Sequence, residues 1–222
     1  MKKIAVILSG CGVMDGSEIH ESVLTLLHLQ KANVAAQCVA PDMPMAEVVN
    51  HLNETKMNES RNVLVEAARI ARGNIKSLGE VDAADFDGAI LPGGYGAVKN
   101  LCNFAEKGEN FEIHPQVEKF LKGLIAAKKP VGFICVAPVM IAKLYPKGVE
   151  LTVGKDKGIA DKLSKLGAKH IEVGVTNIVI DNRYKVVSTP AYMLAKNIAE
   201  ADKGISLLVE EVVLWAEGHQ AK

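Results

Sequence analysis

The residue best placed for chemistry in this sequence is Cys135, which directly follows the short apolar run Val131 to Ile134. The run is typical of a buried strand, and the residues after the cysteine indicate the start of a helix. A side chain at a strand-to-helix turn lies at the carboxyl edge of the sheet, where α/β folds place their chemistry. A helix N-terminus at that point would favour the thiolate, the nucleophilic form of cysteine. We therefore predict that Cys135 is a nucleophile; the alternative is a buried, inert cysteine.

A second candidate is the turn Pro92-Gly93-Gly94, which follows the predicted strand Asp87 to Leu91. Paired glycines permit backbone conformations that other residues avoid, and they let amide N–H groups approach a ligand closely. Such N–H groups could stabilise a developing oxyanion. The spacing fits neither the dinucleotide-binding fingerprint nor the phosphate loop. The alternative is an ordinary turn.

A third candidate is the segment 9–21, which joins the first predicted strand to the first predicted helix and should reach the same edge of the sheet. It carries three acids and one histidine: Asp15, Glu18, Glu21 and His20. We expect Ser17 to be the N-cap of the helix. Acids in a first turn can stabilise a helix dipole without any catalytic role. A metal site built on His20 is a further alternative, but the spacing is not diagnostic, and we expect no metal.

Composition limits the classes of partner. The chain has 222 residues, of which 49% are hydrophobic and 23% charged, so it can bury a sizeable core. Its formal charge is zero and only 5% of residues are aromatic, which argues against a nucleic-acid partner. The apolar run Ile4 to Leu8 is five residues long, too short for a signal peptide, and no stretch reaches the length of a membrane span. We expect neither a nucleic-acid nor a membrane partner.

The four cysteines are widely spaced, at Cys11, Cys38, Cys102 and Cys135. No Cys-x-x-Cys pair is present, which argues against a zinc knuckle or a thioredoxin-like motif. A disulfide framework is not expected in a chain of this size without a secretion signal. We therefore predict free thiols and a cytoplasmic location.

Strand and helix patterns alternate along the chain. The predicted strands, besides 87–91 and 131–134, are 3–8, 34–39, 151–153 and a hairpin formed by 178–180 and 186–188. The predicted helices are 17–32, 58–72, 115–127, 158–166, 193–201 and 204–217, while segment 41–57 is ambiguous and could hold a short helix. This order predicts an α/β fold: one domain, residues 1–222, with a mostly parallel, flavodoxin-like sheet sandwiched by helices.

The first predicted helix carries an apolar stripe that we expect to face the core. Its members are Ile19, Val23, Leu26, Leu27 and Leu29.

Together these motifs resemble the ThiJ/PfpI superfamily, within the class I glutamine-amidotransferase-like fold. The segments that carry the resemblance lie along most of the chain, at 6–12, 15–21, 59–64, 91–101, 133–138 and 188–193. The set is similar to the ElbB-type branch, known as isoprenoid biosynthesis proteins with an amidotransferase-like domain and ascribed a glyoxalase activity.

The resemblance implies roles for individual residues. Cys135 matches the reactive cysteine of the family, and Glu21, rather than Glu18, matches the glutamate that lies against it. Gly94 and Val136 match the positions whose backbone N–H groups form the oxyanion hole. Other residues that the resemblance places near the pocket are Cys11, Glu18, Gly93 and Thr189.

The sequence also departs from better-known members of the superfamily. The proteases carry a histidine directly after the nucleophile, where this chain has Val136. Other members have a histidine in the loop that corresponds to residues 151–155, which contains none. A glutaminase needs a His-x-Glu pair, and His219 has no glutamate two residues later. Peptidase and ammonia-producing activities are therefore not expected.

The resulting hypothesis is a cofactor-independent, glutathione-independent glyoxalase-type lyase that converts glyoxal to glycolate slowly. Cys135 would form a hemithioacetal with the small dicarbonyl substrate, and Glu21 would transfer the proton. The alternative is a non-catalytic redox or electrophile sensor, or a regulatory partner protein, that uses the same cysteine. The resemblance also implies a homo-oligomer, and we expect a dimer.

Overall fold

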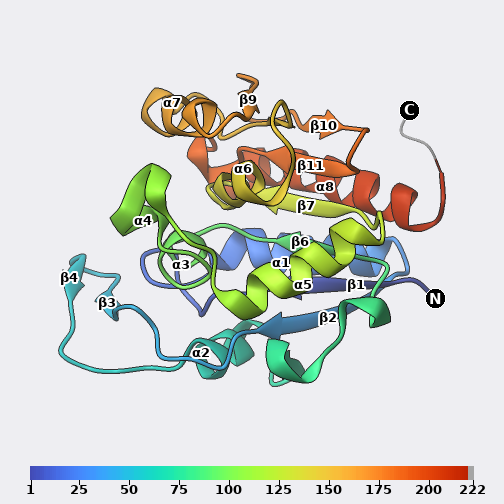
Figure 1. The fold of residues 1–222 in the computed structure, drawn as a ribbon. Coiled ribbons are helices and arrows are strands. Elements are labelled where there is room, and N and C mark those ends of the chain that lie inside the picture. The colour runs from blue at the N-terminus through green and yellow to red at the C-terminus, as the bar shows by residue number, and fades with distance from the viewer. Residues whose placement is uncertain (220–222) are drawn as a thin grey trace.

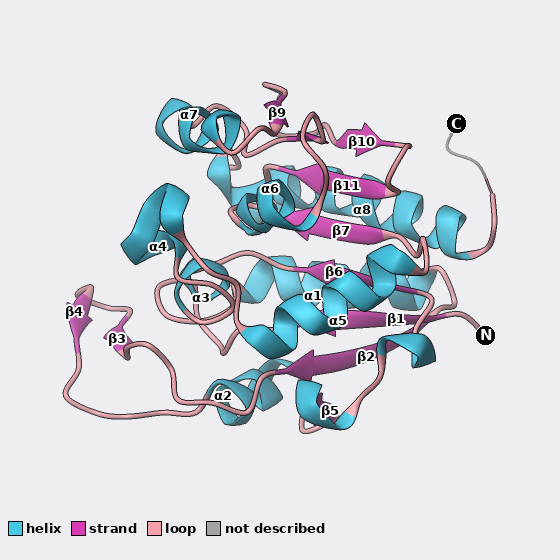
Figure 2. Cartoon of the chain, in the orientation of Figure 1, coloured by secondary structure: helices cyan, strands magenta, loops and turns pink. Residues whose placement is uncertain are grey.

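A seven-stranded sheet runs through the centre of the molecule, and helices cover both of its faces (Figures 1 and 2). The computed structural model describes residues 1–219. The strand order is β10-β11-β7-β6-β1-β2-β5, and every neighbouring pair is parallel except β10 with β11. The strands are β1 (Lys3–Ile7), β2 (Ala35–Ala40), β5 (Ile75–Ser77), β6 (Gly88–Leu91), β7 (Val131–Ile134), β10 (Val179–Asp181) and β11 (Val186–Thr189). The predicted mostly parallel α/β fold is confirmed.

Two layers of helices enclose this sheet. One face carries α1 (Ile19–Lys31), α2 (Val63–Ile70) and α8 (Ile198–Ala216). The other carries α3 (Tyr95–Lys99), α4 (Phe104–Lys107), α5 (Pro115–Ala126), α6 (Ile141–Leu144) and α7 (Lys157–Lys165). Strands buried on both faces need apolar side chains at successive positions, and β1 has them: Ala5 packs into one core cluster, while Ile4 and Val6 pack into the other.

Four adjacent strands bring the candidate site together. In the order β11-β7-β6-β1 they are parallel neighbours, with Thr189 paired to Ile134 and Leu91 paired to Phe133. Parallel strands end at the same edge of a sheet, so the segments that follow these four strands meet there. Cys135, the glycine turn Gly93-Gly94 and the loop before α1 all belong to those segments.

The start of α1 differs from the prediction. The N-cap is Glu18, whose Oε2 accepts a hydrogen bond from the N–H of Glu21 at 2.7 Å. The Ser17 hydroxyl instead accepts from the N–H of Ser9 at 2.8 Å and holds the loop closed. The prediction that Ser17 caps the helix was therefore wrong, because that hydroxyl is used within the loop.

The orientation of α1 is also not the predicted one. Of the five positions predicted to face inward, three are 43%, 49% and 43% exposed: Ile19, Val23 and Leu27. The helix turns a partly polar side toward the sheet, and Glu21, Ser22 and Thr25 on that side are each fully buried. The hydroxyls of Ser22 and Thr25 donate to the backbone carbonyls of Glu18 and Glu21, which satisfies them inside the protein. The apolar pattern predicted the helix but not its buried side.

Segment 41–57 holds a small hairpin instead of the suggested short helix. Its strands are β3 (Val49–Asn50) and β4 (Thr55–Lys56), which Figure 1 shows extending away from the main sheet. Helix α2 begins at Val63, later than predicted, because Asn62 is its N-cap and accepts from the N–H of Val65 at 3.1 Å. The short elements β5, α3 and α4 lie in segments for which no strand or helix was predicted.

The two helices predicted at the end of the chain are one helix, α8. Gly204 suggested a break, but it lies inside α8, where a Cβ would overlap the Thr189 hydroxyl and come within 2.9 Å of the Val175 carbonyl. This glycine therefore allows close packing of the helix on β11. The strand predicted at 151–153 is β8 (Glu150–Leu151), and it pairs with β9 (Lys169–His170) outside the main sheet.

Candidate active site

Cys135 occupies a strained turn directly after β7. Its φ of 64° lies in the left-handed region, which residues with a Cβ seldom adopt. Its N–H donates to the carbonyl of Thr189 at 2.9 Å, which ties the turn to the end of β11. The side chain is 7% exposed. A strained residue between a strand and a helical turn is the geometry of a nucleophile elbow.

The carboxyl group of Glu21 lies beside this turn and is fully buried. Its Oε2 accepts from the N–H of Gly93 at 2.8 Å, and its Oε1 accepts from the N–H of Tyr192 at 3.2 Å. These two amides follow β6 and β11, the strands on either side of β7. Cys135 and the Glu21 carboxyl lie against the same glycine, because a Cβ on Gly93 would come within 2.4 Å of the Cβ of Cys135 and 2.9 Å of Oε2 of Glu21. The structure therefore brings together the cysteine and the glutamate that the resemblance had paired.

Burial changes the protonation of this pair. It raises the pKa of Glu21 to about 8, and the neighbouring carboxylate of Glu18 also acts to raise it. The N–H groups of Tyr192 and Gly93 stabilise the carboxylate and offset part of this increase in the pKa. At neutral pH, Glu21 is therefore mostly a carboxylic acid.

The thiol of Cys135 is also protonated at rest. Burial raises its pKa well above the usual range, and the charge of Glu21 raises it further, while the N–H groups of Gly94 and Val136 lower it. The expectation that a helix begins directly after Cys135 was wrong. The chain after Cys135 forms a 3₁₀ turn, Ala137–Met140, and then the single helical turn α6, so no long helix points its positive end at the sulfur.

The paired glycines fit closely against the site. A Cβ on Gly93 would overlap the Cβ of Cys135 and come within 2.9 Å of Oε2 of Glu21. Gly94 has a φ of +90°, and a Cβ there would overlap the carbonyl of Gly16. The glycine turn therefore leaves no room for a side chain between α1 and Cys135.

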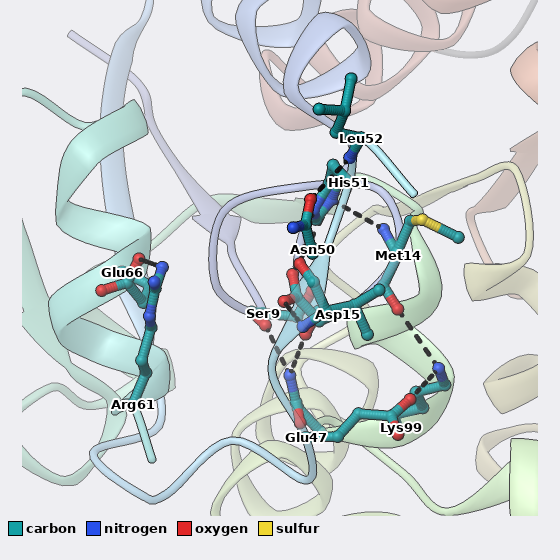
Figure 3. A network of polar contacts seen from close by, with 12 residues as sticks. Ser9, Met14, Asp15, Glu47, Asn50, His51, Leu52, Arg61, Glu66 and Lys99 are labelled. Atoms are coloured by element: carbon teal, nitrogen blue, oxygen red, sulfur yellow. Dashed lines mark hydrogen bonds and ion pairs between the residues drawn. The ribbon is translucent and has the colours of Figure 1, made fainter. Parts of the chain in front are cut away.

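A network of polar contacts braces the loop before α1 (Figure 3). Asn100 donates from Nδ2 to the carbonyls of Ser9 and Asp15 at 2.9 and 2.8 Å. The Asp15 carboxylate accepts from the N–H of Val49 at 2.8 Å, and His51 accepts from the N–H of Met14 at 3.2 Å. Residues far apart in the sequence therefore fix this loop against the end of α3 and the β3–β4 hairpin.

Two of the residues predicted near the pocket have other surroundings. Cys11 is partly buried, and burial, with the charge of Glu66 on α2, raises the pKa of its thiol. Thr189 contributes its carbonyl to the Cys135 turn, but its hydroxyl donates to the carbonyl of Asn177 at 2.9 Å. The other two, Glu18 and Gly93, lie against Glu21.

Tyr192 was not predicted as a site residue, and neither was its contact with His20. The Tyr192 N–H holds Glu21, and its hydroxyl lies 2.7 Å from Nδ1 of His20. Ala191, just before it, has a φ of 39°, so this turn is also strained. Tyr192 belongs to segment 188–193 of the resemblance, but a contact made through a backbone N–H leaves no signal in side-chain type.

Two kinds of feature are absent from residues 1–219. No group of three or more His, Cys, Asp or Glu side chains is arranged to hold a metal ion. No helix in this part of the chain is both long enough and apolar enough to span a membrane.

Similar proteins are known by sequence and by structure. Residues 2–198 match the DJ-1/PfpI family. The chain is 44% identical to the rat "ES1 protein homolog, mitochondrial" over 221 residues, covering 95% of this chain and 83% of that protein. It is 42% identical to the human "Glutamine amidotransferase-like class 1 domain-containing protein 3, mitochondrial", covering 95% and 82%.

Solved structures support the same family match. An isoprenoid biosynthesis protein with an amidotransferase-like domain from Ehrlichia chaffeensis superposes with a TM-score of 0.91 at 34% identity, covering 97% of this chain and 99% of that one. Glyoxalase III from Candida albicans superposes with a TM-score of 0.64 at 15% identity, covering 96% of each chain, and so shares the fold. The matched residues, the identities and the shared fold together show that this chain belongs to the DJ-1/PfpI family.

Proposed function

We propose that the chain is a cofactor-independent glyoxalase-type enzyme that converts glyoxal, a small 2-oxoaldehyde, to glycolate. The observation that carries the proposal is that Cys135 and the buried Glu21 carboxyl lie against the same glycine: a Cβ on Gly93 would come within 2.4 Å of the Cβ of Cys135 and 2.9 Å of Oε2 of Glu21. This arrangement supplies a nucleophile, a proton acceptor and an oxyanion site without any metal ligand.

In the first step the Cys135 sulfur attacks one aldehyde carbon of glyoxal. The thiol proton passes to the ionised carboxylate of Glu21, and the carbonyl π electrons move onto its oxygen. The N–H groups of Gly94 and Val136 stabilise this oxyanion, which then takes the proton back from Glu21 to give a hemithioacetal and restore the carboxylate.

In the second step Glu21 moves a proton between the two carbons of the substrate. The carboxylate removes the hydrogen from the carbon bound to sulfur, which gives an enediolate whose second oxygen takes the hydroxyl proton of the first. Glu21 then returns its proton to the neighbouring carbon. One carbon is thereby oxidised to a thioester and the other is reduced to an alcohol, so no external oxidant or reductant is needed. Water then cleaves the thioester, releasing glycolate and the Cys135 thiol.

The protonation of the pair makes this reaction slow near neutral pH. With a pKa of about 8 for Glu21, roughly one tenth of the molecules carry its carboxylate at pH 7. The rate should therefore rise with pH until Glu21 is ionised. The absence of a histidine from the position after Cys135 also leaves Glu21 as the group that accepts the thiol proton.

Family membership supports the proposal at a coarser level. The DJ-1/PfpI fold is shared with glyoxalase III from Candida albicans, which makes an enzyme of this type plausible for this chain. The names of the rat and human relatives do not specify a reaction on glyoxal. The substrate therefore has to be tested directly.

The test is to incubate the purified chain with glyoxal in the absence of glutathione and to measure glyoxal loss and glycolate formation. We expect saturable turnover, with more than one glycolate formed per chain. Cys135→Ala should lower kcat/KM by roughly 10³-fold or more, because it removes the nucleophile. Cys102→Ala, which changes another buried thiol, is the matched control and should keep full activity.

The alternative role as a sensor gives a different result in the same assay. Intact mass would show stoichiometric modification of Cys135 without glycolate, and that outcome would contradict the enzymatic proposal. Glycolate formation that survives Cys135→Ala would contradict the mechanism.

A further inference from the structure

His51 connects the β3–β4 hairpin to the loop before α1, and its two ring nitrogens have different partners. Nδ1 lies 3.0 Å from the carbonyl oxygen of Val49, and Nε2 lies 3.2 Å from the backbone nitrogen of Met14. A carbonyl oxygen can only accept and a backbone N–H can only donate, so Nδ1 carries a proton and Nε2 is bare. These contacts of His51 are therefore those of a neutral imidazole.

A buried carboxyl oxygen lies close to the bare nitrogen. Asp15 is 5% exposed, and its Oδ2 accepts from the N–H of Val49 at 2.8 Å. Its Oδ1 has no hydrogen-bond partner among residues 1–219, and Nε2 of His51 lies 3.9 Å from it. Buried polar atoms without a partner are rare, and a histidine that takes up a proton would supply the missing donor here.

Gly12 keeps side-chain atoms out of the space beside both groups. A Cβ at Gly12 would come within 2.5 Å of Nε2 of His51 and within 3.3 Å of Oδ1 of Asp15. A hydrogen bond between these two atoms needs a separation of about 2.9 Å, so a movement of the ring by about 1 Å would form it. Once Nε2 carries a proton, it can no longer accept from the N–H of Met14. The two arrangements of the ring therefore exclude each other.

The other titratable and charged side chains around the His51–Asp15 pair come from the loop, the hairpin segment, α2 and its approach, and α3. They are Cys11, Glu47, Glu54, Arg61, Glu66 and Lys99. Lys99 forms an ion pair with Glu47 and donates to the carbonyl of Met14 at 3.2 Å (Figure 3). Arg61 and Glu66 form a second ion pair at 3.5 Å. Among residues 1–219, Asp15 is the acid that lies within 4.0 Å of the His51 ring nitrogens.

We propose that His51 is a pH-dependent switch between the β3–β4 hairpin and the loop before α1: the neutral ring holds the N–H of Met14, and the protonated ring releases it and pairs with Oδ1 of Asp15. The change adds one proton from solvent to Nε2 and exchanges one hydrogen bond for an ion pair. The loop that it controls continues into α1, so the switch lies next to the candidate site. The inference does not depend on the reaction proposed for Cys135.

The experiment is an NMR titration of the ¹⁵N-labelled chain from about pH 5.5 to about pH 8.5, the range in which histidine side chains change charge. The ring nitrogens of His51 report its protonation, and hydrogen exchange reports the protection factor of the Met14 amide, which is corrected for the intrinsic effect of pH on exchange. When His51 takes up its proton, this protection factor should fall roughly ten-fold, because the amide loses its acceptor.

Three variants test the two partners separately. His51→Gln has no ring to protonate, so the Met14 protection factor should be the same at both ends of the pH range. Asp15→Asn removes the negative charge and keeps an oxygen for the N–H of Val49, so the midpoint of the His51 titration should fall by about 1 pH unit. His28→Gln is the matched control, because Nε2 of His28 also lies beside a carboxylate, 2.6 Å from Oδ1 of Asp202, at the contact of α1 with α8. It should leave both His51 and Met14 unchanged.

Three results would each overturn the proposal. They are a wild-type Met14 protection factor that is equal at both ends of the range, a change with pH that persists in His51→Gln, and a His51 midpoint that is the same in Asp15→Asn and wild type. His51 is exposed, so its variants should fold, and His51→Asn replaces His51→Gln if that variant does not. If Asp15→Asn does not fold, the wild-type titration still tests the release of Met14. None of these measurements uses glyoxal, so a failed glyoxal assay would contradict the proposed function alone.

Discussion

Cys135 and Cys102 are both buried thiols, yet their surroundings are very different. They are 7% and 3% exposed, and burial raises the pKa of both, to about 12 for Cys102. Cys102 donates to the carbonyl of Ala97 at 3.4 Å, and the charged group acting on it is Lys143. Cys135 instead has a positive φ, and the Glu21 carboxyl lies with it against Gly93. Burial alone does not make an active site; what distinguishes Cys135 is a neighbouring group that can accept its proton.

The largest expected effect is on the pH dependence of the free energy of unfolding, which the buried Glu21 carboxyl should dominate. The pKa of Glu21 is about 8 in the folded state, against 4.5 for the unperturbed group. Between these values the folded state binds more protons, so the free energy of unfolding should fall as pH rises from 4.5 to 8. The slope is about 1.4 kcal/mol per pH unit and the total is about 5 kcal/mol. Urea unfolding of the wild type and Glu21→Gln across this range measures the difference.

In Glu21→Gln this slope should disappear. The glutamine also has one acceptor oxygen where the carboxyl offers two, and both Gly93 and Tyr192 donate an N–H there. The variant should therefore have a constant offset in stability that does not depend on pH. Cys102→Ala, which has no acid partner, should keep the wild-type slope. If the free energy of unfolding changes with pH equally in wild type and Glu21→Gln, the pKa of Glu21 is not raised. Cys135 would then not differ from Cys102 in having a protonated acid beside it.

A smaller effect should come from Gly93, which has no counterpart at Cys102. In Gly93→Ala the new methyl group would overlap the Cβ of Cys135 and come within 2.9 Å of the Ile134 carbonyl. The turn must then move, which should cost about 1 to 3 kcal/mol of stability. Glycolate formation should fall by roughly 10-fold or more, because small misplacements at a reacting centre are costly. Urea unfolding and the glyoxal assay measure the two effects.

The matched control is Gly158→Ala in α7. A Cβ at that position would meet only Oδ1 of Asp156, at 3.5 Å, which is an ordinary contact. We expect its stability to change by less than about 1 kcal/mol and its activity to be unchanged. Normal turnover in Gly93→Ala would mean that the glycine turn does not set the geometry of the Cys135 sulfur.

The fold could be predicted from the sequence better than the buried side or the length of individual helices. Alternating apolar runs and helical patterns gave the parallel sheet, because strands buried on both faces must be apolar throughout. The buried side of α1 could not be predicted, since Glu21, Ser22 and Thr25 are buried for reasons that hydropathy does not record. The break assigned at Gly204 was wrong because that glycine serves packing against Thr189.

The candidate site was predictable in its residue types but not in its protonation. The positions of Cys135, Glu21 and the two glycines follow from the strand ends and the resemblance. The neutral state of the pair depends on burial and on the distance to Glu18, which only the folded structure provides. The predicted dimer, the absence of nucleic-acid and membrane partners and the cytoplasmic location stay predictions. The rat and human relatives are named as mitochondrial, so location requires a direct measurement.

The smallest expected effect concerns the Tyr192 hydroxyl. Tyr192→Phe removes the contact with His20 and keeps the backbone N–H that holds Glu21. The lost hydrogen bond lies at the exposed side of the site, so the stability should fall by less than about 1 kcal/mol. Turnover should change by less than roughly three-fold, and His20→Ala should behave alike, because each variant breaks the same contact. If Tyr192→Phe lowers kcat/KM by more than roughly ten-fold while His20→Ala does not, the phenol itself takes part in the reaction. The decisive contrast between Cys135 and Cys102 would then include a hydroxyl group as well as a carboxyl.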